Sequence, residues 1–198
     1  WFAYWLMFRP LKDRLGLSNV KFAVTGSSVL SLDTFRLIHA IGIELRQNYA
    51  STEAGFISSH GEGEVHFESI GRPVLGTEVR VTDGGELLVR SKSMFREYHK
   101  DPQKTAAVLI DGWCHTGDIG WLDDEGYLHV SGRKKNMIKS GGISIFPEEI
   151  EDVLSTHPDL AEVAVVACRD PDWGEAVKAL VVPKRGTTVE PTRIIQFC

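Results

Sequence analysis

The strongest constraint on the fold is a strand, helix, strand pattern near the start of the chain. The apolar run Val20–Thr25 predicts a short buried strand, and Ile43–Tyr49 predicts the next one. Between them Ser31 is a suitable N-cap for an amphipathic helix, and Gly42 is a suitable stop. Two strands joined by one helix predict a βαβ unit with parallel strands. The loop Ala50–Gly55 then lies at the carboxyl end of the second strand, where open α/β sheets bind ligands.

The middle of the chain changes to a period of two, which indicates antiparallel strands. Val79 and Val81 alternate with polar residues, and Glu86–Arg90 resumes the pattern after a glycine turn. Asp101 followed by Pro102 predicts the start of a helix that ends near Leu109. Two further expectations complete this β-rich part: a loop at Gly112–Gly120 and a second hairpin at 121–130.

A third region, from about Gly132, predicts a small α+β unit. A short strand at Ile143–Phe146 precedes a helix that Pro147 starts and whose acidic first turn suits the helix dipole. The apolar face expected for this helix comprises Ile150, Val153 and Leu154. Strands are expected at Val163–Ala167 and Ala176–Val182, and the last residues, 196–198, fall within a helical pattern.

Composition excludes several classes of protein. The 198 residues include 42% apolar and 25% charged residues, which is ordinary for a globular chain. A net charge of −5 argues against a general nucleic-acid binder. Three widely spaced cysteines suggest neither a disulfide framework nor a zinc site, and a reducing, cytoplasmic setting is expected. The apolar stretch Trp1–Phe8 is too short to span a bilayer; as an exposed helix it would favour homo-oligomers.

Each polar motif has an ordinary structural explanation when it is taken alone. Ser51 and Thr52 are typical capping residues, and Asp118 is typical of a turn. Tyr49 suits a core position, and the basic run Arg133–Lys135 suits a solvated face.

The order and spacing of these motifs resemble the adenylate-forming superfamily of acyl-CoA synthetases, luciferases and nonribosomal adenylation domains. The family's YGSTE segment is matched by YASTE at residues 49–53, its IGRPxxG by 70–76, and its GELLVRS by 85–91. Its GWxxTGD is matched by 112–118, and its GRxKxxIKxxGxxIxPxEIE by 132–151. A small-residue segment preceding YGSTE is matched by Gly26–Leu30. The resemblance covers nearly the whole chain.

The resemblance implies two parts joined by a hinge. Residues 1–134 would be the C-terminal portion of the large AMP-binding domain, a βαβ unit plus a small β-rich subdomain. Residues 135–198 would be the small, mobile C-terminal domain, of α+β class. In this family the small domain rotates between two half-reactions, and the pivot falls at the position of Lys135.

The resemblance also implies residue roles toward ATP. Tyr49 would lie along the adenine with backbone from Gly26, Ser27 and Ser28, and Thr52 would bind the α-phosphate. Glu53 would hold Mg²⁺, a cation that prefers oxygen ligands. Asp118 and Arg133 would bind the ribose.

Two residues of the third region would serve the second half-reaction, in which coenzyme A displaces AMP. Lys139 is expected to face the active site after the rotation. Gly142 would let the pantetheine chain pass close to the backbone, because glycine has no Cβ.

The implied activity is an ATP-dependent acid–thiol ligase that makes an acyl-adenylate from a carboxylic acid and transfers the acyl group to coenzyme A. Segments 11–17 and 23–27 look most like bacterial fatty-acyl-CoA ligases. Two alternatives stay open, a carrier-protein-loading adenylation enzyme and a non-catalytic nucleotide-binding remnant.

The family's phosphate-gripping loop and its C-terminal catalytic lysine have no counterpart in this sequence. We therefore expect a fragment of a larger enzyme that has little or no ligase activity alone. Two positions also depart from the family pattern: Ala50 replaces a glycine, and Glu97–Tyr98 stands where Gly-Tyr is common.

Overall fold

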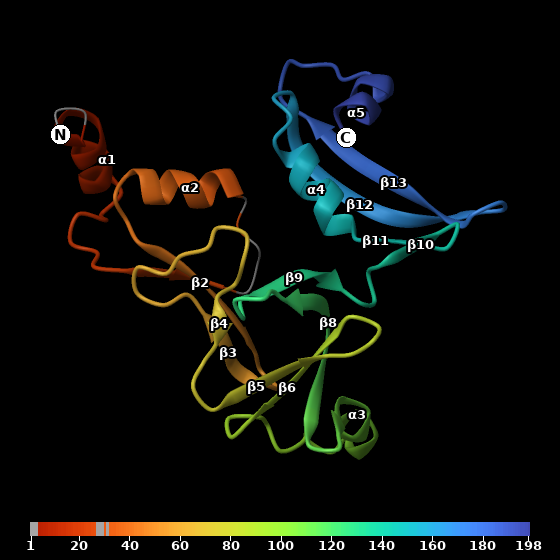
Figure 1. Ribbon diagram of the computed structural model, residues 1–198. Coiled ribbons are helices and arrows are strands. Elements are labelled where there is room, and N and C mark those ends of the chain that lie inside the picture. The colour runs from red at the N-terminus through yellow and green to blue at the C-terminus, as the bar shows by residue number, and fades with distance from the viewer. Residues whose placement is uncertain (1–3, 27–29, 31) are drawn as a thin grey trace. The chain divides into compact units, whose positions relative to one another are not determined.

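The computed structural model describes residues 4–26, 30 and 32–198 (Figure 1). Contacts between residues divide the chain into two compact units, which are described separately. Unit 1 comprises Trp1–Thr116 and Gly120–Val130, and unit 2 comprises Gly117–Ile119 and Ser131–Cys198. The expected α/β class is confirmed. The described strands form three sheets.

The βαβ pattern at the start of unit 1 is confirmed. Its elements are β1 (Ala23–Thr25), α2 (Leu32–Ala40) and β2 (Leu45–Ser51), and β1 pairs in parallel with β2. The first strand starts three residues later than the sequence predicted, and the expected N-cap Ser31 lies outside the described residues. The helix α2 contacts β2, and its Phe35 side chain is fully buried. Gly42 follows the helix with a φ of +81°, which suits a helix end. The sheet continues with two antiparallel strands, β3 (Gly55–Ser59) and β4 (Arg72–Pro73).

A second sheet follows in the order β5-β6-β8-β7, with β9 paired to β8. Its strands are β5 (Thr77–Val81), β6 (Glu86–Ser91), β7 (Leu109–Ile110), β8 (Trp113–Leu122) and β9 (Leu128–Arg133). The helix α3 (Pro102–Val108) begins where Asp101 caps it, because the Asp101 carboxylate accepts the Lys104 N–H at 2.9 Å.

The prediction of a loop at Gly112–Gly120 was wrong, because β8 runs through most of it. The glycines that suggested a loop have local explanations. Gly117 has a φ of +71°, which glycine adopts easily. A Cβ at Gly120 would lie 2.1 Å from the carbonyl oxygen of His129, so this glycine permits close contact with β9.

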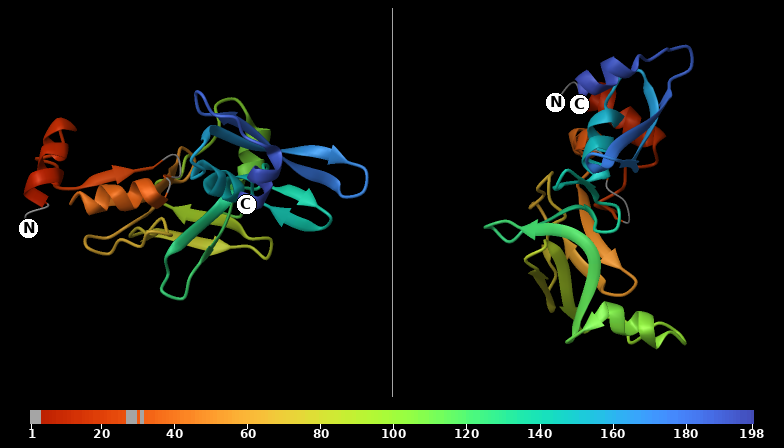
Figure 2. Two further views of the ribbon diagram at one scale, coloured as in Figure 1. Left: turned by 90° about the horizontal axis from the view of Figure 1, so that it is seen from above. Right: turned by 90° about the vertical axis from the view of Figure 1, so that its right-hand side faces the viewer.

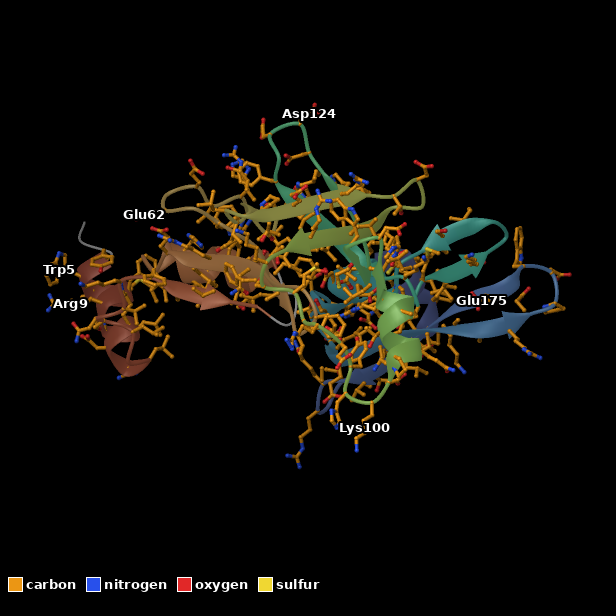
Figure 3. All side chains as sticks on the ribbon, turned by 90° about the horizontal axis from the view of Figure 1, so that it is seen from below. Trp5, Arg9, Glu62, Lys100, Asp124 and Glu175 are labelled. Atoms are coloured by element: carbon orange, nitrogen blue, oxygen red, sulfur yellow. The ribbon has the colours of Figure 1, made fainter. Side chains whose placement is uncertain are left out.

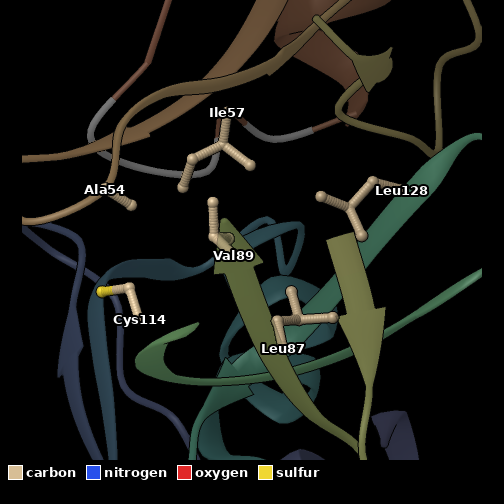
Figure 4. Close-up of a cluster of buried hydrophobic side chains, with 6 residues drawn as sticks. All are labelled: Ala54, Ile57, Leu87, Val89, Cys114 and Leu128. Carbon is tan, nitrogen blue, oxygen red and sulfur yellow. The ribbon is translucent and has the colours of Figure 1, made fainter. Parts of the chain in front are cut away.

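The core of unit 1 joins the two sheets. Six buried side chains form it, contributed by the β2–β3 turn, β3, β6, β8 and β9 (Figure 4): Ala54, Ile57, Leu87, Val89, Cys114 and Leu128. Alternate residues of a strand point to one face, so these strands bury one face on this cluster.

Unit 2 is an α+β unit, as the sequence predicted. Its elements are β10 (Ile138–Ser140), β11 (Ile143–Ile145), α4 (Pro147–Ser155), β12 (Leu160–Asp170), β13 (Gly174–Pro183) and α5 (Pro191–Phe197). The antiparallel sheet has the order β11-β10-β13-β12. The two helices pack on it around Leu154, Leu160 and Ile194 (Figures 1 and 2). Val153 is 43% exposed, so its predicted place on the apolar face of α4 was wrong.

The N-terminal segment is helical, in two short pieces, η1 (Tyr4–Phe8) and α1 (Arg9–Arg14). Leu6 and Met7 are well exposed, and the guanidinium of Arg9 lies over the ring of Trp5 (Figure 3). Homo-oligomerisation through this segment stays a prediction. Among the described helices, each is too short or too polar to cross a bilayer.

Candidate functional site

The candidate phosphate-binding residues lie in a tight turn between β2 and β3 of unit 1. The hydroxyl of Ser51 accepts the Ala54 N–H at 3.0 Å, which closes the turn. Gly55 reverses the chain with a φ of +73°, and a Cβ there would lie 2.6 Å from the Ser93 hydroxyl. The turn leaves Thr52 exposed and Glu53 half-buried. Both therefore stand at the carboxyl end of β2, where the sequence placed the site.

Glu53 is held at its side chain and at its backbone. Its Oε1 accepts a hydrogen bond from the hydroxyl of Tyr98 at 2.6 Å, and its carbonyl oxygen accepts the Phe95 N–H at 2.8 Å. The hydrogen bond to Glu53 is the main cause that raises the pKa of Tyr98 to about 12. Sequence reasoning missed Tyr98 as a contact of Glu53. The unusual Glu97–Tyr98 pair was visible, but nothing local connects it to a residue 45 positions earlier.

The charge of Glu53 also acts on the thiol of Cys114. Cys114 is 1% exposed in the core of unit 1. Burial, with a smaller contribution from Glu53, raises the pKa of this thiol to about 11. The thiol therefore stays neutral near pH 7 and is no candidate nucleophile.

Tyr49, the residue expected to lie along the adenine, also contributes to the core of unit 1. Tyr49 is half-buried and packs against the core of unit 1, on β2. At Gly26 a Cβ would meet the side-chain oxygen of Asn48 at 1.9 Å, so the backbone after β1 lies directly against β2. Ser27 and Ser28 lie outside the described residues.

The expected ribose-binding residues meet within unit 2. Asp118 lies on β8 and Arg133 ends β9, and Nε of Arg133 lies 2.9 Å from Oδ1 of Asp118. The Asp118 side chain is 7% exposed, and that of Arg133 is 52% exposed. Strand pairing thus brings together two residues that are 15 positions apart. The adjacent Gly132 lies close to α4, since a Cβ there would lie 2.6 Å from the Glu148 carboxylate.

The predicted pivot and acceptor residues lie on exposed turns and strand ends of unit 2. Lys135 is exposed in the turn that follows β9. Lys139 is exposed on β10, and its backbone N–H donates to the Glu175 carboxylate at 2.7 Å. Gly142 has a φ of +87° in the β10–β11 turn, with open space where a Cβ would stand. The roles given to these three residues stay predictions.

The structure thus groups the candidate residues in two sets. Tyr49, Thr52 and Glu53 belong to unit 1, whereas Asp118 and Arg133 belong to unit 2. Each set is local to its own unit.

A divalent cation fits the first set only in part. The described residues contain no cluster of three or more His, Cys, Asp or Glu side chains suited to a metal. Glu53 offers one carboxylate and Thr52 an exposed hydroxyl. Mg²⁺ commonly binds through one or two carboxylates together with substrate phosphates, so this oxygen set fits a cation that arrives with ATP.

Comparison with known proteins identifies the family. The AMP-binding enzyme family matches residues 3–99, and the AMP-binding enzyme C-terminal domain matches residues 149–198. An indoleacetate–CoA ligase of Aromatoleum aromaticum is 41% identical over 97% of this chain and 40% of its own length. The long-chain-fatty-acid–CoA ligase FadD13 of Mycobacterium tuberculosis is 34% identical over 96% of this chain and 40% of its own length.

The solved structures agree. The o-succinylbenzoate CoA synthetase MenE of Bacillus subtilis, in complex with its acyl-adenylate, matches with a TM-score of 0.85 and 28% identity. That match covers 95% of this chain and 42% of MenE. The chain belongs to the adenylate-forming, AMP-binding enzyme family. It spans about 40% of the length of the two curated relatives named above.

Proposed function

We propose that this chain takes part in the ATP-dependent ligation of a carboxylic acid to coenzyme A through an acyl-adenylate. The acid attacks the α-phosphorus of ATP and pyrophosphate leaves; the thiol of coenzyme A then attacks the acyl carbon and AMP leaves. The observation that carries the proposal is the contact between Asp118 and Arg133, the two residues to which the family resemblance assigns the ribose. The family membership and the names of the relatives support the same chemistry.

Each residue is given one role toward the nucleotide. Asp118 accepts hydrogen bonds from the ribose hydroxyls, and Arg133 both orients this carboxylate and reaches the ribose. Tyr49 offers its ring to the adenine, beside the backbone at Gly26. The hydroxyl of Thr52 donates to the α-phosphate, and Glu53 holds the cation. Mg²⁺, when bound, neutralises charge on the phosphates of ATP.

Two predicted roles belong to the acceptor step. Lys135 is the pivot between the two half-reactions, and the segment with Lys139 and Gly142 then serves the coenzyme A thiol. The exposure of these three residues is compatible with a role at a moving surface. The domain boundary at 134/135 is part of the same proposal.

For the acid itself we propose a largely apolar carboxylic acid, with a fatty acid as the first candidate. The relative that acts on long-chain fatty acids supports this choice, and the relative that acts on indoleacetate supports an aromatic acid as the second candidate. Coenzyme A is favoured as the acceptor over a carrier protein, because both relatives are named CoA ligases.

Nucleotide binding by the 198-residue chain tests the proposal. Calorimetry with AMP is expected to show saturable binding that Asp118→Asn weakens by roughly tenfold or more, since a hydrogen bond to a charged group is worth about 1.5–3 kcal/mol. Asp124→Asn, at an exposed acid in the next turn, is the matched control and should bind as the unmodified chain does. Absence of AMP binding, or equal loss in both variants, would overturn the assignment. The substrate class is tested on the intact parent enzyme, by AMP release across a panel of fatty and aromatic acids, with and without coenzyme A.

A further inference from the structure

The hydroxyl of Tyr98 and the carboxylate of Glu53 form a short contact within unit 1. The distance of 2.6 Å is typical of a hydrogen bond from a hydroxyl to an ionised oxygen. Both side chains are half-buried. Among the described residues of unit 1, no lysine or arginine forms an ion pair with Glu53. Glu53 is therefore a carboxylate that accepts a hydrogen bond from a neutral donor and forms no ion pair with the described residues of its own unit.

The ring of Tyr98 is fixed from two sides. Phe95 packs against it edge-to-face with centroids 4.8 Å apart, and the Lys104 ammonium lies 4.2 Å from the ring centroid. The Tyr98 N–H donates to the Thr105 hydroxyl at 2.9 Å, and Thr105 donates in turn to the Asp101 carbonyl. The capped helix α3 thus carries two of the groups that hold Tyr98, Lys104 and Thr105.

The backbone beneath Glu53 is fixed as well. The Phe95 N–H donates to the Glu53 carbonyl at 2.8 Å, and the Ser91 hydroxyl donates to the carbonyl of Ala54 at 3.3 Å. Ala54 is fully buried. Both ends of the hydrogen bond between Tyr98 and Glu53 therefore start from rigid positions, so the bond selects one orientation of the carboxylate.

We propose that Tyr98 is a positioning residue that holds one oxygen of Glu53, so that the other is presented to the divalent cation of a bound nucleotide. The inference rests on the proposed function, because it assigns the cation to Glu53. Carboxylates that bind metals are commonly oriented by a hydrogen bond from a second residue, and loss of such a partner typically lowers metal affinity 10–100-fold. The Cys114 thiol, which stays neutral, adds no competing negative charge nearby.

The test removes the hydroxyl alone. Tyr98→Phe keeps the ring contacts with Phe95 and Lys104, and thermal melting is expected to change little. Mn²⁺ binding to the 198-residue chain in the presence of ATP, followed by electron paramagnetic resonance, is expected to weaken roughly tenfold or more. Metal-free AMP binding should not change, which separates positioning from a general structural effect. Tyr127→Phe, at a buried tyrosine elsewhere in unit 1, is the matched control.

Glu53→Gln completes the experiment and separates the two hypotheses. In the Glu53→Gln background, Tyr98→Phe should cause no further loss of Mn²⁺ affinity, because the oriented carboxylate is already gone. If Glu53→Gln weakens Mn²⁺ binding but Tyr98→Phe does not, the positioning role is wrong and the proposed function stands. If the unmodified chain binds ATP but Glu53→Gln leaves its Mn²⁺ affinity unchanged, the cation assignment is wrong and the positioning role falls with it. If the unmodified chain binds no ATP, the proposed function itself fails.

Discussion

Arg133 and Asp118 form an ion pair between two residues of very unequal exposure. The contacting atoms are 2.9 Å apart, yet the aspartate side chain is almost fully buried while half of the arginine side chain is in solvent. A buried carboxylate depends strongly on the groups that stabilise its charge, whereas an exposed guanidinium loses little when its partner is removed. The ion pair therefore contributes to stability mainly by compensating the buried charge of Asp118.

Arg133→Met is expected to destabilise unit 2 by about 1–2 kcal/mol. Removing one partner of a fully buried pair typically costs about 3–5 kcal/mol, and the solvent around Arg133 reduces that figure. Urea unfolding measures the effect. Arg169→Met, at an exposed arginine of β12, is the control and should lie within about 0.5 kcal/mol of the unmodified chain. Equal stability of the two variants would contradict the dependence of Asp118 on Arg133.

Gly71→Ala is expected to be far more damaging than Gly76→Ala, although both glycines have φ near +80°. A Cβ at Gly71 would lie 1.9 Å from the carbonyl carbon of Ser59, whereas at Gly76 it would meet nothing within 4 Å. The shared backbone strain is worth about 1–2 kcal/mol. We expect Gly76→Ala to show only that loss in thermal melting, and Gly71→Ala to abolish cooperative unfolding or soluble expression. Similar melting of both variants would show that β3 and the Gly71 segment can separate at little cost.

Local sequence patterns predicted much of this fold because their causes are local. Two adjacent residues, Asp101 and Pro102, were enough to predict the start of α3, and the Asp101 cap is present. The βαβ unit and the hairpin of β5 and β6 were predicted from periodicity and glycine turns, and both are confirmed. The positions of Thr52 and Glu53 after β2 followed from the same reasoning.

Long-range contacts account for what the sequence did not reveal. β8 continues through a glycine-rich stretch because neighbouring strands pair with it, and no local signal reports those neighbours. β10 is three residues long and pairs with β11 and β13. The contact between Tyr98 and Glu53 depends on the path of the whole β-rich part of unit 1. The position of Thr52 and Glu53 after β2 was therefore predictable from the sequence, whereas the groups that hold Glu53 in place were not.

Acid is expected to destabilise unit 1 through His60. This side chain is 3% exposed, its Nδ1 accepts the Gln47 N–H at 3.1 Å, and burial lowers its pKa, with smaller effects from the charges of His66 and His39. Because the unfolded chain takes up this proton near the ordinary pKa of about 6.5, stability is present above that pH and is lost as pH falls below it.

Melting temperatures between pH 7.5 and 5.5 measure this effect. His60→Gln is expected to flatten the pH dependence while it lowers stability at pH 7.5, because the buried hydrogen bonds are lost. His99→Gln, at an exposed histidine, should leave the slope unchanged. An equally steep slope in His60→Gln would assign the acid sensitivity to another group.

The three cysteines are expected to react at very different rates with a thiol reagent at pH 8. Cys198 is exposed at the end of α5, whereas Cys114 is buried with a pKa of about 11, so roughly one Cys114 thiol in a thousand is ionised. Cys168 is intermediate, since it is partly buried and donates to the Ala176 carbonyl at 3.4 Å. Cys198→Ser should therefore remove the fast phase, and Cys114→Ser should leave it intact. In urea, the slow reaction of Cys114 should accelerate with the opening of unit 1, because only unfolding exposes and deprotonates this thiol. A fast phase that disappears in Cys114→Ser would mean that the core around Ala54 and Val89 is open in the native chain.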